Sequence, residues 1–190
     1  MDHPPVITFG RNAKPENLLS SAEVLELEGI ELAQTNRGGD ITFHGPGQLV
    51  GYPIICLEDI RKDVVWYVRS LEEVLIQTLQ DIGICASRKP GMTGVWVDGN
   101  GRGPAKIAAI GVHISRWVTS HGFALNLETD LDSYRHIVPC GISAYPVTSI
   151  KQTLGGCPDH QGVEDRVIHH FMQKFGLTPR VASGSQFSLR

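Results

Sequence analysis

The sequence KIAAIGVHISRWVTSHGFALNL, residues 106–127, contains two runs of alternating apolar residues that meet near Arg116. Alternation with a period of two is typical of β-strands, because successive side chains point to opposite faces of a sheet. We predict two long strands here, at 106–115 and 117–127, paired as a hairpin.

Shorter elements flank this hairpin. The strongest helix signal begins after Asp63, a good N-cap residue, and ends at Gly83, with apolar residues every three or four positions at Val64, Val68, Leu71, Leu75, Leu79 and Ile82. A last amphipathic helix is predicted around Val163, Val167, Phe171 and Phe175. We also expect a short helix from Ser20 or Ser21 to Glu28, strands at 6–9, 30–35, 48–57 and 94–97, and a turn at 98–101.

The order of these elements predicts the fold class. Strand-rich segments, a few interposed helices and short connections indicate a mixed α+β or α/β domain, with flanking helices on a mainly antiparallel sheet. Glycines and prolines punctuate the chain without a repeat or a linker-like stretch, which favours a single domain. We place this domain at residues 1–178 and a C-terminal tail at 179–190.

Composition narrows the class of protein. Of the 190 residues, 41% are hydrophobic and 19% are charged, which is enough apolar surface for a stable core. The N-terminus carries no signal-peptide pattern, and no stretch is long enough to span a membrane. A net charge of -3 without a dense run of lysine or arginine argues against a nucleic-acid partner.

The four cysteines, at positions 56, 85, 140 and 157, are widely and unequally spaced in a chain without an export signal. This pattern predicts free thiols in a reducing cytoplasm. Cys140 differs from the other three because Pro139 fixes the backbone before it and Gly141 leaves it uncrowded. A cysteine presented in this way is a candidate nucleophile, whereas a buried and inert cysteine is the commoner case.

The segment RGGDITFHGPGQ, residues 37–48, contains four glycines, a proline, an arginine and a histidine. A plain turn needs far fewer special residues. Glycines at this density let backbone N–H groups approach a ligand, and Arg37 and His44 add side-chain donors. The segment therefore fits either a loop that cradles a substrate or an irregular connection between strands, and composition alone weighs the two equally.

Lys106 opens the first strand of the hairpin. Strict alternation places it on one face with Ala108, Ile110, Val112 and Ile114, and that face is apolar. A lysine there either extends its ammonium group to solvent, which is the commoner outcome, or is partly desolvated and able to act as a base.

Two other kinds of site are disfavoured by the sequence. The eight histidines form no His-x-x-x-His or His-Glu-x-x-His pair, and the cysteines form no Cys-x-x-Cys pair, so we expect no catalytic metal. The glycine-rich stretch 99–103 lacks the lysine and Ser/Thr of a phosphate-binding loop. We interpret it as a mobile loop before Lys106.

Four motifs occur together in one order along the chain: RGGDITFHGPGQ at 37–48, KIAAIG at 106–111, HGFALN at 121–126 and VPCG at 138–141. This set resembles the octanoyl-acyl-carrier-protein:protein N-octanoyltransferases, also called lipoyl(octanoyl) transferases. The resemblance extends from about Asp2 to the helix that ends near Phe175.

The resemblance implies a fold shared with biotin and lipoate protein ligases, and a two-step acyl transfer without a cofactor. Carried onto this sequence, it implies that Cys140 is the nucleophile and that Lys106 activates it and moves protons. It also implies that three segments line the acyl substrate, namely Arg37, Gly38, Gly39, Asp40, Ile41, Thr42, Phe43 and His44, then Ala109, Ile110 and Gly111, then Gly122, Phe123 and Ala124.

The resemblance further implies the reaction partners. The donor would be octanoyl-acyl-carrier-protein, and the acceptors would be lipoyl domains of 2-oxo-acid dehydrogenase complexes and the glycine cleavage H protein, with no part for nucleic acid or membrane. Basic residues at the mouth of the site would attract an acidic carrier. The candidates are Arg11, Lys14, Arg61, Lys62 and Arg102, unless these are simply scattered solvated charges.

One departure and two alternatives accompany the resemblance. Family members usually have a first strand and helix before the segment that matches Asp2 to Ile7, so either the start of this chain is misplaced or the chain lacks an element that usually joins the sheet. An ATP-dependent lipoate- or biotin-type ligase would share the architecture, but it would need a nucleotide loop that the sequence does not show. A non-catalytic relative that only holds an acyl chain is the other alternative.

Overall fold

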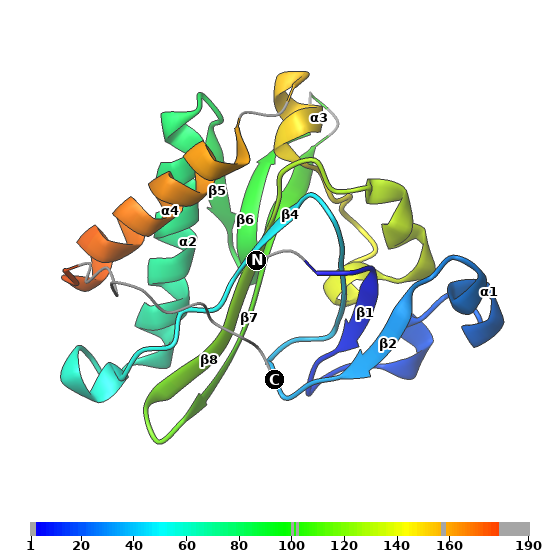
Figure 1. Ribbon diagram of the computed structural model, residues 1–190, viewed down its shortest axis with the longest axis horizontal. Helices are drawn as coiled ribbons and strands as arrows, with labels where there is room; N and C mark the ends of the chain where they lie inside the picture. The colour runs from blue at the N-terminus through cyan, green and yellow to red at the C-terminus, as the bar shows by residue number, and fades with distance from the viewer. Residues whose placement is uncertain (1–2, 100, 102, 157–158, 179–190) are drawn as a thin grey trace, which may run out of the picture.

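Two sheets and two long helices form the computed structural model of this chain, which describes residues 3–99, 101, 103–156 and 159–178. The large sheet occupies the middle of the molecule, with helices α2 (Val64–Asp81) and α4 (His160–Phe175) on one side and the small sheet on the other (Figure 1). Two shorter helices, α1 (Ala22–Leu27) and α3 (Ile150–Leu154), lie at the edges.

The small sheet has the strand order β2-β1-β3, with β1 at Val6–Phe9, β2 at Glu31–Gln34 and β3 at Ile41–His44. Strand β1 pairs in parallel with β2 and antiparallel with β3. Successive side chains along each strand therefore point to opposite faces of this sheet. One face, which includes Ile7, Ile41 and Phe43, packs in a core with Leu25 of α1 and Tyr134.

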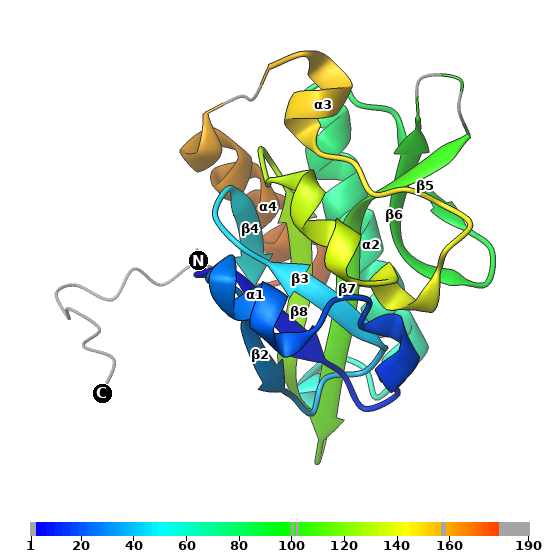
Figure 2. The ribbon, with the colours of Figure 1, turned by 90° about the vertical axis from the view of Figure 1, so that its right-hand side faces the viewer.

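The large sheet has the order β4-β8-β7-β6-β5 and is antiparallel throughout. Its strands are β4 (Gln48–Gly51), β5 (Ala86–Lys89), β6 (Met92–Asp98), β7 (Pro104–Ser115) and β8 (Val118–Asn126). Three-residue or longer 3-10 helices at Pro15–Asn17, Leu57–Asp59, Leu131–His136 and Pro139–Gly141 join the elements. The last two lie beside α1 and the small sheet (Figure 2).

The main core lies between the large sheet and helices α2 and α4. Leu71, Leu75 and Leu79 of α2 are fully buried against Ile107 and Leu125 of the sheet. Burying a side chain of this size contributes roughly 1.5–3 kcal/mol relative to leaving it exposed. The helix begins where the sequence predicted, because the Asp63 carboxylate accepts a hydrogen bond from the N–H of Trp66 at 2.9 Å.

A β-bulge in the middle of the sheet changes which face Lys106 occupies. Trp96 of β6 lies opposite Lys106, and Val95 lies opposite Ala108, so Ile107 is an extra residue on β7. Residues opposite one another share a face, and neighbours on a strand do not. Lys106 and Ala108 therefore point to opposite faces, and the prediction that Lys106 shares a face with Ala108 and Ile110 is wrong.

Most of the predicted elements are confirmed, with shifts of one or two residues at their ends. A single sheet was predicted, and the structure has two. The strand predicted at 48–57 ends at Gly51, since Pro53 has no N–H group to donate to a ladder. The segment 41–44, predicted as part of a loop, is strand β3, and both β5 and α3 were not predicted.

Some predictions fall on residues outside the described part of the chain. These are the tail at 179–190, Cys157, and Asn100 and Arg102 in the connection between β6 and β7. The boundary at residue 178 stays a prediction. Within the described residues, no helix combines the length and the apolar character needed to cross a membrane.

Candidate active site

A cavity of about 600 Å³ lies between the small sheet and the face of the large sheet that is turned away from α2 and α4. Every strand of the small sheet contributes to its lining, and so do β4, β7, β8 and the turn between β5 and β6. Most of the lining is apolar. A cavity of this volume and character fits a small molecule or an acyl chain.

Most of the residues predicted for the site line this cavity. They are Arg37, Gly38, Gly39, Asp40, Thr42, His44, Lys106, Ala109, Ile110, Gly111, Gly122, Phe123, Ala124 and Cys140. Ile41 and Phe43 do not, because β3 alternates and turns these two side chains into the core of the small sheet. The structure thus brings together segments that are far apart in the sequence.

Cys140 lies in the short 3-10 helix Pro139–Gly141 with a left-handed backbone, at φ 56° and ψ 20°. Non-glycine residues rarely adopt this conformation, and such strained positions concentrate at functional sites. Gly141 follows with φ 67°, and a Cβ atom there would lie 2.7 Å from the carboxylate of Asp40. The glycine is therefore required for the loop that carries Cys140 to approach Asp40.

The same carboxylate anchors the loop that faces Cys140. Asp40 accepts hydrogen bonds from the side-chain amide of Asn17 at 2.5 Å and from the backbone N–H of Lys14 at 3.1 Å. The backbone carbonyl of Asn17 in turn accepts from the N–H of Val138 at 2.8 Å. Asn17 and Asp40 together hold the residues before Cys140 against the glycine-rich segment.

Lys106 is only 6% exposed and reaches the cavity because of the bulge at Ile107. Its ammonium nitrogen lies 4.9 Å from the centre of the Trp96 ring. A Cβ atom at Gly94 would lie 2.7 Å from the carbonyl oxygen of Ala108 and 3.3 Å from the Lys106 Cε atom, so a glycine fits here beside the lysine stem. In the described part of the chain, no carboxylate lies within 4.0 Å of this ammonium group.

Arg37 is a second buried cation in the cavity, at 8% exposure. Its guanidinium donates to the carbonyl of Thr8 at 2.6 Å and to the Thr8 hydroxyl at 2.9 Å. Burial lowers the pKa of Arg37, and negative charge on Cys140, Asp40 or Tyr52 acts in the opposite direction. An anion in this cavity is therefore favoured by Arg37.

His44 connects the cavity to a buried polar network. Its Nδ1 atom lies 2.7 Å from the side-chain oxygen of Gln48, whose amide donates to Asn126 at 2.9 Å. Asn126 donates in turn to the carbonyl of Thr148. Burial lowers the pKa of His44 to about 4, so the ring is neutral near pH 7. Gln48 is the last residue of the motif at 37–48, and Asn126 is the last residue of the motif at 121–126. Their hydrogen bond links the two motifs, which gives both residues a structural role.

The sequence did not point to several side chains at the site. His3, Thr8, Tyr52 and His121 line the cavity, and Trp96 supports Lys106. His121 belongs to the motif HGFALN, and its positive φ of 56° inside a strand is visible only in the structure. Thr8 is the single polar residue of the strand Val6–Phe9, and this was the one signal that could have indicated it.

Other sites for chemistry are not formed by the described residues. Among them, no three His, Cys, Asp or Glu side chains gather in a way that could hold a metal ion. Cys56 and Cys85 are free thiols that do not line the cavity. Of the three cysteines that the structure describes, Cys140 alone lines the cavity, together with the cations Arg37 and Lys106.

Sequence comparison places the chain beside proteins with a known activity. The profile of the family described as the lipoyl protein ligase A/B catalytic domain matches residues 1–172. The octanoyltransferase of Solibacter usitatus is 55% identical, with 92% of this chain and 76% of that protein covered. The octanoyltransferase of Koribacter versatilis is 58% identical, with 82% of this chain and 62% of that protein covered.

Structural comparison gives the same fold at lower identity. A crystal structure of lipoate-protein ligase A bound with ATP matches with a TM-score of 0.77 at 17% identity, covering 94% of this chain and 72% of that chain. The biotin protein ligase of Aquifex aeolicus matches with a TM-score of 0.55 at 15% identity, covering 93% and 70%. The predicted biotin/lipoate ligase-like fold is confirmed.

Proposed function

Since the chain belongs to the lipoyl protein ligase A/B catalytic-domain family, within its octanoyltransferases, we propose that Cys140 and Lys106 carry the octanoyl transfer. The resemblance predicted from the four motifs is confirmed, and the chain is an acyltransferase that serves lipoylation. One observation carries the assignment of roles. Cys140 and Lys106 come from distant segments, and both open into one apolar cavity.

In the first step, we infer that the Cys140 thiolate attacks the carbonyl carbon of an octanoyl thioester. A new C–S bond forms to Cys140, the donor's C–S bond breaks, and the donor leaves as a thiolate that takes a proton from the Lys106 ammonium, which leaves Lys106 neutral for the second step. The ammonium of Lys106 and the guanidinium of Arg37 favour the thiolate over the thiol. Arg37 also favours the negative charge that develops on the carbonyl oxygen.

In the second step, the amine of an acceptor lysine attacks the Cys140 thioester. The amide bond forms, the bond to sulfur breaks, and the attacking nitrogen loses a proton, for which neutral Lys106 is the acceptor. The donor is already an activated thioester, so this scheme needs no nucleotide. Lys106 thus serves as a cation in one step and as a base in the other.

The cavity residues have complementary parts in this scheme. Ala109, Gly111, Gly122 and Ala124 line the cavity on the large sheet, and Thr42 and His44 line it on the small sheet. The acyl chain would lie against these residues, with its thioester end toward Cys140. A neutral His44 suits this role, because it presents no charge to the chain.

Family membership indicates the general class of each reaction partner, and the specific partners are a proposal. An acyl donor and a lipoyl-domain acceptor follow from the family. We propose octanoyl-acyl-carrier-protein as the donor, and lipoyl domains of 2-oxo-acid dehydrogenase complexes and the glycine cleavage H protein as acceptors. A cytoplasmic location stays a prediction.

The ligase alternative is not favoured by any feature of the cavity. Likeness to ATP-dependent ligases at 17% identity concerns the fold, whereas the relatives at 45–58% identity are octanoyltransferases. The non-catalytic alternative is decided by experiment.

The test is mass spectrometry of the chain after incubation with octanoyl-acyl-carrier-protein. We expect an octanoyl adduct, sensitive to hydroxylamine, on the peptide that contains Cys140, and no adduct in Cys140→Ser. Cys56→Ser and Cys85→Ser are matched controls, since both are free thiols outside the cavity, and each should keep the adduct. An adduct that persists in Cys140→Ser, or no adduct at all, would sink the assignment.

A further inference from the structure

Trp96 is a large buried side chain that does not belong to either apolar core. It is 2% exposed, yet neither the core under α2 and α4 nor the core of the small sheet includes it. Its neighbours on β6, Val95 and Val97, both pack in the main core. Alternation therefore turns the indole to the cavity side of the sheet, where Lys106 lies.

The indole is the surface on which the Lys106 side chain lies. Trp96 and Lys106 are direct cross-strand partners, and the ammonium nitrogen is 4.9 Å from the ring centre. This separation is within the range of a cation–π interaction, which is stronger at desolvated sites. Gly94, two residues before Trp96 on the same face, clears space for the lysine stem.

Trp96 also connects Lys106 to the segment that follows the nucleophile. Its ring packs edge-on against Tyr145, with the ring centres 5.7 Å apart. Beside Tyr145, the carbonyl of Pro146 accepts from the N–H of Lys106 at 2.9 Å, and the N–H of Thr148 donates to the carbonyl of Lys106 at 2.9 Å. The backbone of Lys106 is thus held by Pro146 and Thr148, and its ammonium group lies over the Trp96 ring, which packs on Tyr145 of the same segment.

One detail shows that an apolar ring alone would not explain this residue. The indole Nε1–H is buried and has no hydrogen-bond partner among the described residues. A buried donor without a partner is destabilising, and phenylalanine would avoid it. Tryptophan, however, presents the best face for a cation among the aromatic side chains.

We propose that Trp96 is a positioning residue that holds the Lys106 ammonium group on the cavity side of the large sheet, which Cys140 also faces, during acyl-enzyme formation. The inference rests on the proposed roles of Cys140 and Lys106. Because the ring stabilises the cation and not the neutral amine, it supports the first half-reaction and gives no advantage in the second, where Lys106 must accept a proton.

The two half-reactions are measured separately to test this. Octanoylation of Cys140 by the carrier is followed by rapid quench and mass spectrometry, and transfer is followed from preformed acyl-enzyme to a lipoyl domain. In Trp96→Leu we expect acylation to fall roughly 3- to 30-fold, the range that loss of a cation–π contact allows, while transfer changes much less. Trp96→Phe should restore part of the acylation rate and unfold at the same or a higher temperature than the unsubstituted chain.

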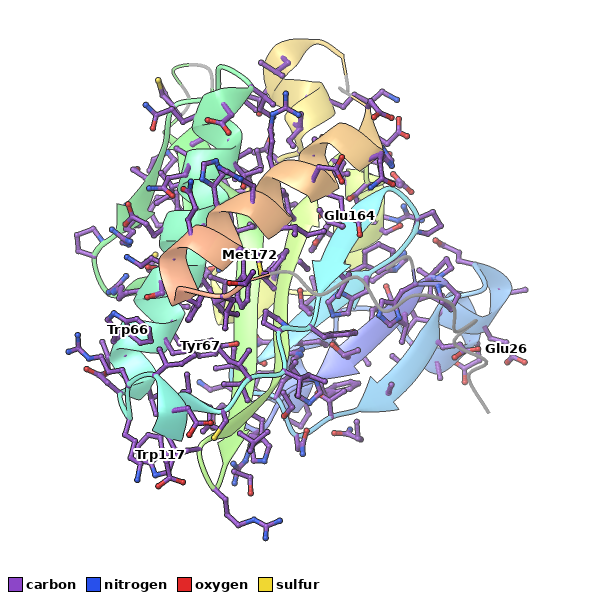
Figure 3. The ribbon with its side chains drawn as sticks, turned by 60° about the vertical axis from the view of Figure 1, so that its left-hand side comes forward. Glu26, Trp66, Tyr67, Trp117, Glu164 and Met172 are labelled. Atoms are coloured by element: carbon purple, nitrogen blue, oxygen red, sulfur yellow. The ribbon has the colours of Figure 1, made fainter. Side chains whose placement is uncertain are left out.

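Trp66→Leu is the matched control. Trp66 also has a cation over its ring, Arg61 at 5.6 Å, but it lies at the start of α2 and does not line the cavity (Figure 3). This variant should leave both half-reactions unchanged, whatever it does to stability.

Equal falls of both half-reactions in Trp96→Leu would overturn the proposal, since the ring would then be a structural support only. If that variant does not fold, Trp96→Phe decides, and an acylation rate equal to that of the unsubstituted chain overturns the proposal. Failure of the unsubstituted chain to form the Cys140 adduct would instead overturn the proposed function, and this inference with it.

Discussion

The two faces of the large sheet differ in what they contain and in what they do. The face toward α2 and α4 carries fully buried aliphatic side chains such as Val95, Ile107 and Leu125. The face toward the small sheet carries Lys106, small residues and an open cavity of about 600 Å³. The packed core therefore lies on one face and the candidate catalytic groups lie on the other, although the same strands supply both.

This division has a physical reason. A buried cation without a carboxylate and a residue with a left-handed backbone both destabilise a fold, and close packing elsewhere must offset them. The strands β7 and β8 are well anchored on the helix side, so their other side is free to hold strained or charged groups. Substitutions on the two faces should consequently affect different measurements.

The largest expected effect is on the cavity face, in Lys106→Arg. Arginine keeps the positive charge but does not give up its proton near neutral pH. We expect acyl-enzyme formation to survive better than transfer to the acceptor lysine, which should fall about 10²- to 10⁴-fold. Lys174→Arg, at an exposed lysine of α4 that does not line the cavity, is the control. Equal loss of both half-reactions would mean that Lys106 acts through geometry or packing.

On the helix face, Leu75→Ala should affect stability and spare the chemistry. Leu75 is fully buried in the main core, and deleting it should lower the free energy of unfolding by about 2–5 kcal/mol. Urea unfolding measures the free energy of unfolding and gives the folded fraction. Single-turnover acylation measures the rate of the folded molecules. Val65→Ala, at a residue 70% exposed on the same helix, should change little. A slower acylation rate per folded Leu75→Ala molecule would break the division between the faces.

The pH dependence of stability should carry a contribution from His44 on the cavity side. Its pKa is lowered by burial from 6.5 to about 4, so between these values the unfolded state binds more protons than the folded state. The free energy of unfolding should then fall as pH falls, by at most about 1.4 kcal/mol per pH unit from this group. The contribution is fully present above pH 6.5 and is lost as pH approaches 4.

His44→Gln removes this titration. Urea unfolding of both proteins is measured from roughly pH 4.5 to 7.5, which covers most of the interval between the two pKa values. The free energy of unfolding should fall less steeply with falling pH in the variant. Parallel curves would show that His44 is protonated as easily in the folded protein as in the unfolded chain.

The smallest effect should come from surface charge. Arg61 pairs with Asp63 at 3.0 Å and Lys62 pairs with Glu58, both beside the start of α2. Lys14 instead lies beside the cavity, where its N–H donates to Asp40, and no carboxylate of the described residues lies within 4.0 Å of its ammonium. If the carrier docks by charge, Lys14→Glu should raise KM roughly severalfold without lowering kcat, and Lys62→Glu should not.

The salt dependence gives the same prediction a second measurement. The association rate should fall steeply as the screening length shortens to roughly 10 Å and below, while single-turnover chemistry should change little. A KM that does not respond to salt or to Lys14→Glu would mean that the acyl chain and local contacts drive recognition.

Elements with a strong local signal could be predicted from the sequence, and those set by distant partners could not. The repeat of apolar residues after Asp63 located α2 almost to the residue. Strand β3 has only four residues in a glycine-rich stretch. Its partner β1 lies far from it in the sequence, so no local pattern indicates the pairing. The division into two sheets depends on such long-range pairing, which no local pattern records.

The candidate site shows the same limit. The sequence singled out Cys140 and Lys106, and the structure places both in one cavity, although their catalytic roles stay a prediction. Alternation put Lys106 on the wrong face, because the bulge is defined by the register with β6. Trp96 lies in the strand predicted at 94–97, and nothing in its local sequence distinguishes it from its neighbours. Its contact with Lys106 depends on the pairing of β6 with β7.

The extra residue at Ile107 also sets a rule about chain length. Lys106 and Ala109 are separated by an odd number of positions, which in a regular strand would put them on opposite sides. Deleting the extra residue between them would leave Lys106 and Ala109 two positions apart, so a regular strand without the bulge would keep the lysine on the same face as Ala109. A strand of the present length without the bulge would instead turn the lysine toward α2, so the number of residues between Lys106 and Ala109, more than the identity of residue 107, decides which face the lysine occupies.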